Sequence, residues 1–250
     1  MTHFLVVVPF HNAWPWITTC LGSVHAQRYP DVDVIVADDA STDKSGEHAR
    51  YSCEGYGWQF HRNPANERMP HNLRLAIAAA DPEPETVIVI VDGDDWLPHG
   101  QVLDSLARVY ADPELWLTWG SYTRWPDPAY MPNPAREWPL DVVKERSYRG
   151  CYHVTPFNHP LTFRAHLWAQ VADADLQDDH GRWFTAAYDA AIMFPMTEMA
   201  GPEHGRYLPE VLYVYNESNP LSDGRTHAVE CDYAHNQIRR RPARAPYVRA

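Results

Sequence analysis

Four consecutive residues, Asp92-Gly93-Asp94-Asp95, place three carboxylates at the end of an apolar run. That run, Val87-Ile-Val-Ile-Val91, is entirely β-branched and is typical of a buried strand. Open α/β sheets bind ligands where their strands end. Carboxylates this close repel one another, and Mg²⁺ or Mn²⁺ held by Asp92 and Asp94 would relieve the repulsion. The alternative is a simple turn, because Asp-Gly is a turn signal and Asp95 could cap a following helix.

A second acidic segment, Asp38-Asp39-Ala40-Ser41-Thr42-Asp43, also follows an apolar run. Asp39 could accept a hydrogen bond from a base N–H or a ribose hydroxyl, and the alternative is a turn residue at a helix entry. The chain has no G-x-G-x-x-G after its first apolar run and no G-K-[ST] loop, which argues against an NAD-type fold and against ATP hydrolysis. A nucleotide bound here would need a cation for its diphosphate, and that cation would also act as a Lewis acid on a departing diphosphate.

Strands and helices alternate through the first half of the chain. Strands are predicted at 4–8, 32–37, 58–61, 87–91 and 115–119, and helices at 14–27, 44–51, 69–80 and 99–110. One strand–helix pair takes roughly 25 to 30 residues, which is typical of βαβ units and a mostly parallel sheet flanked by helices. Since parallel strands end at one edge of a sheet, we expect Asn12, Asp39, Asn63 and the Asp92–Asp95 group to lie together.

The pattern changes after Gly120. Residues 125–160 hold seven prolines together with Trp125, Tyr130 and Trp138, and predict a long ordered loop that covers a site or carries specificity, with a linker as the alternative. Helices are predicted at 161–171 and 183–193, a turn at 178–181, and a strand at 207–215. The final twelve residues carry five arginines and no acid, which predicts a solvated basic tail or, as the alternative, a phosphate or nucleic-acid contact.

Composition sets the broad limits. A chain of 250 residues can bury a sizeable core, and its net charge of −12 disfavours non-specific binding of polyanions. The four cysteines form no C-x-x-C and indicate neither a zinc site nor a disulfide framework. No apolar run approaches the length of a membrane span, and the segment 4–8 lacks the basic flank and cleavage site of a signal peptide. We therefore expect a cytoplasmic protein.

Three segments in this order resemble inverting family 2 glycosyltransferases of GT-A fold. They are Val6-Val-Val-Pro9-Phe-His-Asn12, Val36-Ala-Asp38-Asp39-Ala-Ser-Thr-Asp43 and Val91-Asp92-Gly93-Asp94-Asp95, and the likeness covers residues 1 to 120. The resemblance implies a Rossmann-like, mostly parallel sheet with an acceptor-side C-terminal part. It also implies a UDP-sugar donor, Mn²⁺ or Mg²⁺, and transfer of a hexose to an acceptor hydroxyl with inversion.

The resemblance also assigns donor-side roles. Its donor-binding set is Pro9, Asn12, Asp39, Asn63, Asn72, Asp92 and Gly93. Asp39 matches the residue that contacts uracil, and Asp92 and Asp94 match the D-x-D pair, whose second aspartate ligates the metal directly. Asn63 and Asn72 correspond to an Asn-x-Gly and an Ala-Arg-Asn segment, where this chain has Asn63-Pro64-Ala65 and Pro70-His71-Asn72. His227 lies where several GT-A enzymes supply a third metal ligand, and a surface histidine is the alternative.

The second half is similar to a subset of these enzymes in the segments 158–163, 189–201 and 213–220. The family's catalytic base lies in this region, often within Glu-Asp, and Tyr188-Asp189 occupies the place here. Asp189 is therefore the predicted base, which takes the proton of the attacking hydroxyl. Glu198 is the competing candidate, and Asp178 and Asp179 are predicted to be turn residues.

These assignments divide the chain into a nucleotide-sugar-binding half at 1–120, an acceptor-binding and catalytic half at 121–238 and the basic tail at 239–250. Two other classes stay open, a nucleotidyltransferase and a non-catalytic nucleotide-sugar-binding module. The acceptor is equally open between a glycan, a protein, a small molecule and a hydroxymethylated DNA base.

Overall fold

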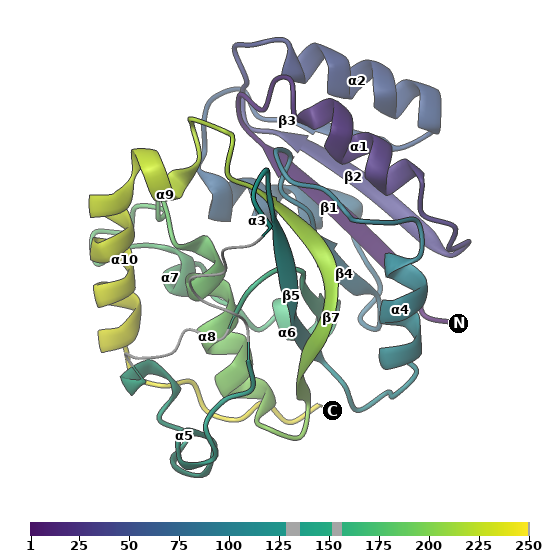
Figure 1. Ribbon diagram of the computed structural model, residues 1–250. Coiled ribbons are helices and arrows are strands. Elements are labelled where there is room, and N and C mark those ends of the chain that lie inside the picture. Colours follow the sequence, from purple (N-terminus) through teal and green to yellow (C-terminus); the bar gives the residue numbers. More distant parts are fainter. Residues whose placement is uncertain (129–135, 152–156, 250) are drawn as a thin grey trace.

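The computed structural model describes residues 1–128, 136–151 and 157–249. Its strands form one sheet (Figure 1) and are, in chain order, β1 (Phe4–Phe10), β2 (Val32–Asp38), β3 (Gln59–Arg62), β4 (Val87–Ile90), β5 (Leu117–Trp125), β6 (Leu161–Arg164) and β7 (Gly205–Asn216). Across the sheet the order is β3-β2-β1-β4-β6-β5-β7. β6 runs antiparallel to both of its neighbours, and the other neighbouring pairs are parallel. The predicted mostly parallel sheet is confirmed.

Helices pack on both sides of this sheet. Those of the first half are α1 (Ile17–His25), α2 (Ser45–Tyr56), α3 (Met69–Ala80) and α4 (Val102–Val109). Those of the second half are α5 (Leu140–Glu145), the 3₁₀ helix η1 (Tyr148–Gly150), α6 (Ala165–Trp168), α7 (Asp173–Leu176), α8 (Tyr188–Ala200), α9 (Asp223–Thr226) and α10 (Ala228–Arg240). The predicted alternation of strand and helix is confirmed up to β5, although several ends differ. Within the described ranges, no helix is long and apolar enough to cross a membrane.

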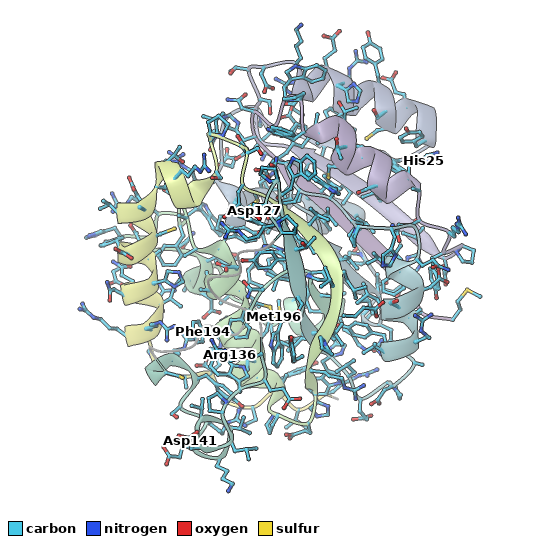
Figure 2. All side chains as sticks on the ribbon, viewed as in Figure 1. His25, Asp127, Arg136, Asp141, Phe194 and Met196 are labelled. Carbon is cyan, nitrogen blue, oxygen red and sulfur yellow. The ribbon has the colours of Figure 1, made fainter. Side chains whose placement is uncertain are left out.

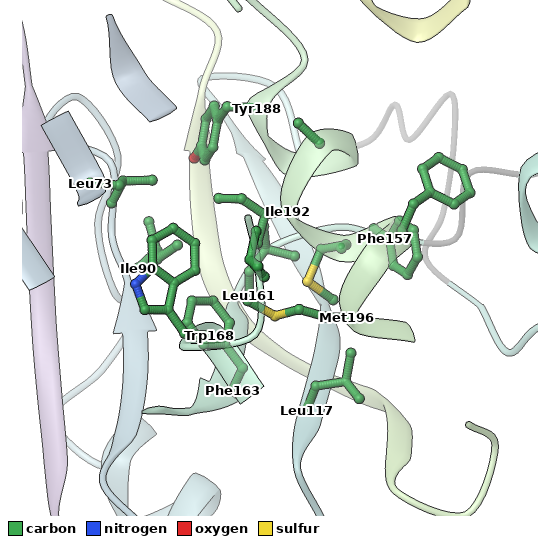
Figure 3. Packing of buried hydrophobic residues seen from close by; sticks show 14 of the residues in the cluster. Leu73, Ile90, Leu117, Phe157, Leu161, Phe163, Trp168, Tyr188, Ile192 and Met196 are labelled. Carbon is green, nitrogen blue, oxygen red and sulfur yellow. The ribbon is translucent and has the colours of Figure 1, made fainter. Parts of the chain in front are cut away.

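The central strands are buried on both faces, because their side chains alternate between the two sides of the sheet. In β1, Leu5 and Val7 belong to one hydrophobic cluster, and Val6 and Val8 belong to another. The first cluster includes side chains of α3, α6 and α8, and the second includes side chains of α1, α2 and α4. Figure 3 shows part of the first cluster, with Ile192 of α8 packed towards the strands. Burial on both faces explains the unbroken apolar runs in the sequence.

The helix predicted at 161–171 is wrong in its first part. These residues form β6, which is inserted between β4 and β5, and only then α6. Leu161 and Phe163 are buried in the first cluster, whereas the Thr162 hydroxyl bonds to those of Thr118 and Tyr110, at 2.6 and 2.8 Å. Four residues of alternation are too few to distinguish a strand from a helix by periodicity alone.

Other predictions for the second half need smaller corrections. The helix expected at 183–193 is α8, which begins at Tyr188 and continues to Ala200. The region 125–160 was expected to be a loop, but α5 and η1 lie in its described parts. Trp138 is buried in the first hydrophobic cluster, and Tyr130 lies outside the described residues.

Two arginines of the C-terminal segment, Arg241 and Arg244, contact the body of the protein, so the expectation of a solvated tail is wrong for these two. Arg241 donates hydrogen bonds to the carbonyl oxygens of Asp175 and Gln177. Nη1 of Arg244 lies 3.1 Å from Oδ2 of Asp175. Side-chain donors of this segment thereby satisfy acceptors at the end of α7, which ties the tail to the second half of the chain.

We expect the buried side chain of His166 in α6 to make the stability of the protein depend on pH. It is buried, and neither ring nitrogen has a hydrogen-bond partner in the part of the chain that the structure describes. Burial lowers its pKa to about 4, whereas a histidine in an unfolded chain has a pKa of about 6.5. The unfolded chain therefore binds the proton first, and we expect the free energy of unfolding to fall as the pH drops from about 6.5 towards 4. His166→Phe should reduce this loss in urea denaturation at acid and neutral pH, and an equal loss in both proteins would contradict it.

Candidate active site

A cleft of about 670 Å³ opens at the edge of the sheet where β1, β2 and β4 end. The first turn of α8 and the segment after β7 supply further walls. Predicted site residues that line it are Pro9, Asn12, Asp39, Asn72, Asp92, Gly93, Asp94, Asp189 and His227. Asn63 is the predicted site residue that does not line it. The fold thus brings together residues that are far apart in the sequence.

Asp39 follows β2 and is only 3% exposed. Its carboxylate accepts hydrogen bonds from Nδ2 of Asn63 at 2.8 Å and from the backbone N–H groups of Glu67 and Arg68 at 2.8 and 3.0 Å. The Asn63 amide also donates to Oδ1 of Asn72 at 2.9 Å. Asn63 therefore lies behind Asp39 and fixes it, while Asp39 and Asn72 reach the cleft.

Asn12 fixes the segment after β1. Its φ of 52° lies in the left-handed region, which asparagine adopts more readily than most residues. Its side-chain oxygen accepts hydrogen bonds from the backbone N–H groups of Thr42 and Asp43 at 2.8 and 3.3 Å, and its own N–H donates to Oγ of Ser41 at 2.9 Å. Asn12 thus joins the loops after β1 and β2 into one wall of the cleft.

Gly93 lets the loop after β4 lie directly against β1. A Cβ atom at this position would be 2.4 Å from Cβ of Phe10, closer than real side chains approach. The N–H of Gly93 donates to the carbonyl of Pro9 at 3.0 Å. This close approach sets Asp92 and Asp94 at the end of the two central strands.

The Asp92 carboxylate is held by the hydroxyl of Tyr188, which lies 2.7 and 2.8 Å from its two oxygens. Burial, and then the neighbouring Asp94, raise the pKa of Asp92 to about 7. Nε2 of His159 lies 3.6 Å from Oδ2 of Asp92, and its ring stacks on Tyr213. Burial lowers the pKa of His159.

Two asparagines, one at the end of β7 and one just beyond it, hold the rest of this loop. Nδ2 of Asn219 donates to Oδ2 of Asp94 at 2.7 Å, and Nδ2 of Asn216 donates to the Asp94 carbonyl at 3.0 Å. The backbone N–H of Asn216 donates to Oδ1 of Asp95 at 2.7 Å. Asp95 is therefore bound to β7 and is not the helix cap considered above, since α4 begins only at Val102.

Tyr188, Asn216 and Asn219 were not among the predicted site residues. A signal existed for the asparagines, because both follow the strand predicted at 207–215, as Asp39 follows the strand predicted at 32–37. The signal for Tyr188 was weaker: it stands where the family often has the glutamate of a Glu-Asp pair. Sequence spacing could not show that either segment reaches the loop after β4.

Asp92 and Asp94 supply carboxylate oxygens, the hard ligands that Mg²⁺ and Mn²⁺ prefer. Burial also raises the pKa of Asp94, and a divalent cation would offset the cost of holding two charged carboxylates there. The donor set therefore fits such a cation. Across the described ranges, no group of three or more His, Cys, Asp or Glu side chains is arranged to hold a metal. His227 lines the cleft with Nδ1 4.0 Å from Oε2 of Glu230, and its role as a third ligand stays a prediction.

Asp189 lies in the first turn of α8, at the wall of the cleft. Ala187, directly before the helix, has a φ of 59° and turns the chain into the helix. Oδ1 of Asp189 accepts a hydrogen bond from the backbone N–H of Ala190 at 2.8 Å, and a helix N-terminus favours a carboxylate. The side chain is partly exposed and is the carboxylate of α8 that a ligand hydroxyl in the cleft can reach.

Glu198, the competing candidate for the base, is occupied elsewhere. It is 1% exposed, and its oxygens accept hydrogen bonds from Nε and Nη2 of Arg149 at 2.6 and 2.8 Å and from the N–H of Arg244 at 2.9 Å. It does not line the cleft. Asp178 pairs with Arg182 in the turn predicted for it.

Arg149→Ala should therefore lower the free energy of unfolding and leave the residues that line the cleft unchanged. The change leaves Glu198 as a buried carboxylate without its cationic partner, so we expect a loss of about 3–5 kcal/mol in the free energy of unfolding. Urea denaturation measures this loss. A change below about 1 kcal/mol, the size typical of ordinary substitutions, would contradict the structural role of the pair.

The same architecture is present in solved structures. TarS of S. aureus superimposes with a TM-score of 0.64 at 19% sequence identity, over 88% of this chain and 37% of that chain. The mannosyltransferase PcManGT from Pyrobaculum calidifontis, solved with GDP-Man and Mn²⁺, superimposes with a TM-score of 0.58 at 21% identity, over 85% of this chain and 56% of that chain. The fold is that of GT-A glycosyltransferases, as predicted.

The model of the glycosyl transferase family 2 matches residues 5–162, and the chain belongs to this family. It is similar to glycosyltransferase GlyG of Streptococcus pneumoniae, at 28% identity over 104 residues, which are 39% of this chain and 32% of that protein. It is also similar to the glycosyltransferase EpsJ of Bacillus subtilis, at 32% identity over 96 residues, covering 37% of this chain and 26% of that protein. The chain thus spans a third or less of these relatives.

Proposed function

We propose that this glycosyltransferase moves a sugar from a UDP-sugar to an acceptor hydroxyl with inversion, assisted by Mn²⁺ or Mg²⁺. The observation that carries the proposal is one cleft lined by Asp39, by Asp92 and Asp94, and by Asp189. Structures of a TarS fragment with UDP-GlcNAc and of PcManGT with GDP-Man and Mn²⁺ support the donor class and the cation.

On the donor side, Asp39 accepts a hydrogen bond from the uracil, and the joined loops after β1 and β2 enclose the nucleoside. Asn63 acts behind Asp39 by holding its carboxylate. Asp94, with Asp92, would hold the cation, which supplies Lewis-acid stabilisation of the diphosphate. Two carboxylates are enough protein ligands for this, since Mg²⁺ sites commonly complete their coordination with substrate phosphates and water.

On the acceptor side, Asp189 takes the proton of the attacking hydroxyl. The new bond forms between that oxygen and the anomeric carbon, while the bond from the anomeric carbon to the diphosphate oxygen breaks and UDP leaves. Attack from the side opposite to the leaving group inverts the anomeric centre in one displacement. General base catalysis of this kind contributes roughly 10²- to 10⁴-fold to the rate.

A screen of UDP-, GDP- and TDP-sugars with Mn²⁺ tests the proposal. We expect UDP-sugars to raise the melting temperature and to release UDP slowly to water. Release of pyrophosphate from a nucleoside triphosphate would instead indicate a nucleotidyltransferase. Binding of a nucleotide sugar without any turnover, even with acceptors supplied, would indicate a binding module.

A further inference from the structure

The sugar of a bound donor has a defined place in the cleft. Under the proposed function, the nucleoside lies at Asp39 and the diphosphate at Asp92 and Asp94. The anomeric carbon must then lie between the leaving diphosphate oxygen and the hydroxyl that Asp189 deprotonates. The sugar is therefore expected between the loop after β4 and the first turn of α8, and a side chain that lines the cleft there can contact it.

His159 lines this part of the cleft. Its Nε2 atom lies 3.6 Å from Oδ2 of Asp92. Burial lowers the pKa of His159, and the charges of Asp189 and Asp94 act on the ring in the opposite direction. The imidazole is therefore close both to the carboxylates proposed for the cation and to the proposed base.

Within the part of the chain that the structure describes, neither ring nitrogen of His159 makes a hydrogen bond. Nδ1 is enclosed and has no partner. Nε2 is too far from Asp92 for a hydrogen bond, at 3.6 Å. The side chain is 13% exposed although Nδ1 is enclosed, so Nε2 is the nitrogen that a ligand can reach. Most buried polar atoms in proteins have a partner, and here a ligand in the cleft can supply the missing one.

Packing fixes the ring before any ligand binds. The imidazole stacks on the ring of Tyr213, with centroids 4.6 Å apart and an interplanar angle of 20°. Tyr213 is fully buried in β7, and its hydroxyl accepts the backbone N–H of Asp92 at 3.1 Å. The N–H of Gly120 donates to the carbonyl of Asn158, directly before His159, at 3.0 Å. A side chain that is already fixed loses little conformational freedom on binding, which favours affinity.

The chemistry of Nε2 fits a sugar hydroxyl. An imidazole nitrogen donates or accepts a hydrogen bond according to its tautomer, and a hydroxyl can do either, so the two match in both tautomers. The alternative partner is the cation. Mg²⁺ and Mn²⁺ prefer oxygen ligands, and across the described residues no three His, Cys, Asp or Glu side chains are arranged to hold a metal, which favours the hydroxyl.

We propose that Nε2 of His159 binds a hydroxyl of the transferred sugar and that this contact selects among UDP-sugars. The inference rests on the proposed function, because the position of the donor decides which of its groups reaches His159. A donor whose hydroxyl is missing or turned away would leave Nε2 without a partner. A site built to hydrogen-bond a hydroxyl discriminates against such a donor.

The test is calorimetric titration, with Mn²⁺ present, of UDP and of the UDP-sugar that wild type binds most tightly among UDP-glucose, UDP-galactose and UDP-N-acetylglucosamine. His159→Phe keeps the ring on Tyr213 but removes both nitrogens. We expect it to weaken the UDP-sugar by about 3- to 10-fold and to leave UDP unchanged. His159→Gln should recover most of the loss, because its amide nitrogen reaches the position of Nε2. His159→Asn should not, because its amide nitrogen reaches only the position of Nδ1.

Stability distinguishes a ligand contact from a structural role. Since the nitrogens of His159 make no hydrogen bond within the described ranges, His159→Phe should not lower the free energy of unfolding in urea. His25→Phe is the matched control. His25, labelled in Figure 2, stacks on Tyr56 with centroids 3.8 Å apart and does not line the cleft. This variant should bind UDP and the UDP-sugar as wild type does.

Two results would overturn the inference while the proposed function stands. One is that His159→Phe keeps the wild-type ratio of UDP-sugar affinity to UDP affinity because neither changes. The other is that both affinities fall equally, which would place His159 at the cation or the nucleotide. If His159→Phe does not fold, His159→Asn decides between the same outcomes. Failure of wild type to bind UDP with Mn²⁺ would overturn the proposed function, and the inference with it.

Discussion

Asp94→Ala is expected to reduce sugar transfer and donor hydrolysis by at least about 100-fold, the scale of losing a group that stabilises developing charge. It should also remove the Mn²⁺-dependent part of UDP binding, because Asp94 would be the direct ligand of the cation. Asn219 holds only one oxygen of this carboxylate, Oδ2, at 2.7 Å. Turnover with a UDP-sugar and calorimetric titration of UDP with and without Mn²⁺ measure the two effects.

Asp141→Ala is the matched control for this change. Asp141 is an exposed aspartate of α5, is labelled in Figure 2 and does not line the cleft. Its loss should leave both the turnover and the effect of Mn²⁺ as in wild type. Full turnover by Asp94→Ala would remove Asp94 from the site of the cation.

Asp189→Asn is expected to lower transfer to an acceptor by roughly 10²- to 10⁴-fold, the contribution of a general base. The amide keeps the size of the side chain and its contact with the N–H of Ala190 but cannot take a proton. UDP affinity should stay within a few fold of wild type, because the proposed role of Asp189 is on the acceptor side. Steady-state transfer rates and calorimetry of UDP binding distinguish the two effects.

Glu198→Gln provides the comparison for Asp189→Asn. Glu198 is on the same helix but is bound to Arg149, so this change should lower stability and keep transfer at temperatures where the protein stays folded. The opposite result, with Asp189→Asn active and Glu198→Gln inactive although folded, would exchange the two roles. Loss of UDP binding in Asp189→Asn would place Asp189 on the donor side.

The carboxyl-end edge of the sheet could be predicted because its determinants are local. Each buried parallel strand is an unbroken apolar run, and the polar residues directly after it therefore lie at that edge. Asp39, Asp92 and Asp94 were therefore placed correctly in one cleft from spacing alone. The fit of Gly93 against Phe10, where a residue with a Cβ would clash, is a contact between distant segments and was not predicted from the sequence.

The second half depends on contacts that spacing does not encode. β6 has four residues and becomes a strand because β4 and β5 offer it partners on both sides. In the sequence Glu198 is a candidate base, and only the fold brings Arg149, 49 positions earlier in the chain, beside it. The hydroxyl of Tyr188 reaches Asp92 across 96 positions. Tertiary packing determines the strand β6 and both of these side-chain contacts, and such packing cannot be read from the periodicity of a single sequence.

The most direct test of the proposed donor and metal site is a crystal structure of the protein with UDP and Mn²⁺, with the metal located by its anomalous scattering. We expect an anomalous peak beside the carboxylates of Asp94 and Asp92, with the uracil at Asp39 and the diphosphate between them. A nucleotide bound outside this cleft, or a metal peak away from both aspartates while UDP occupies the cleft, would contradict it.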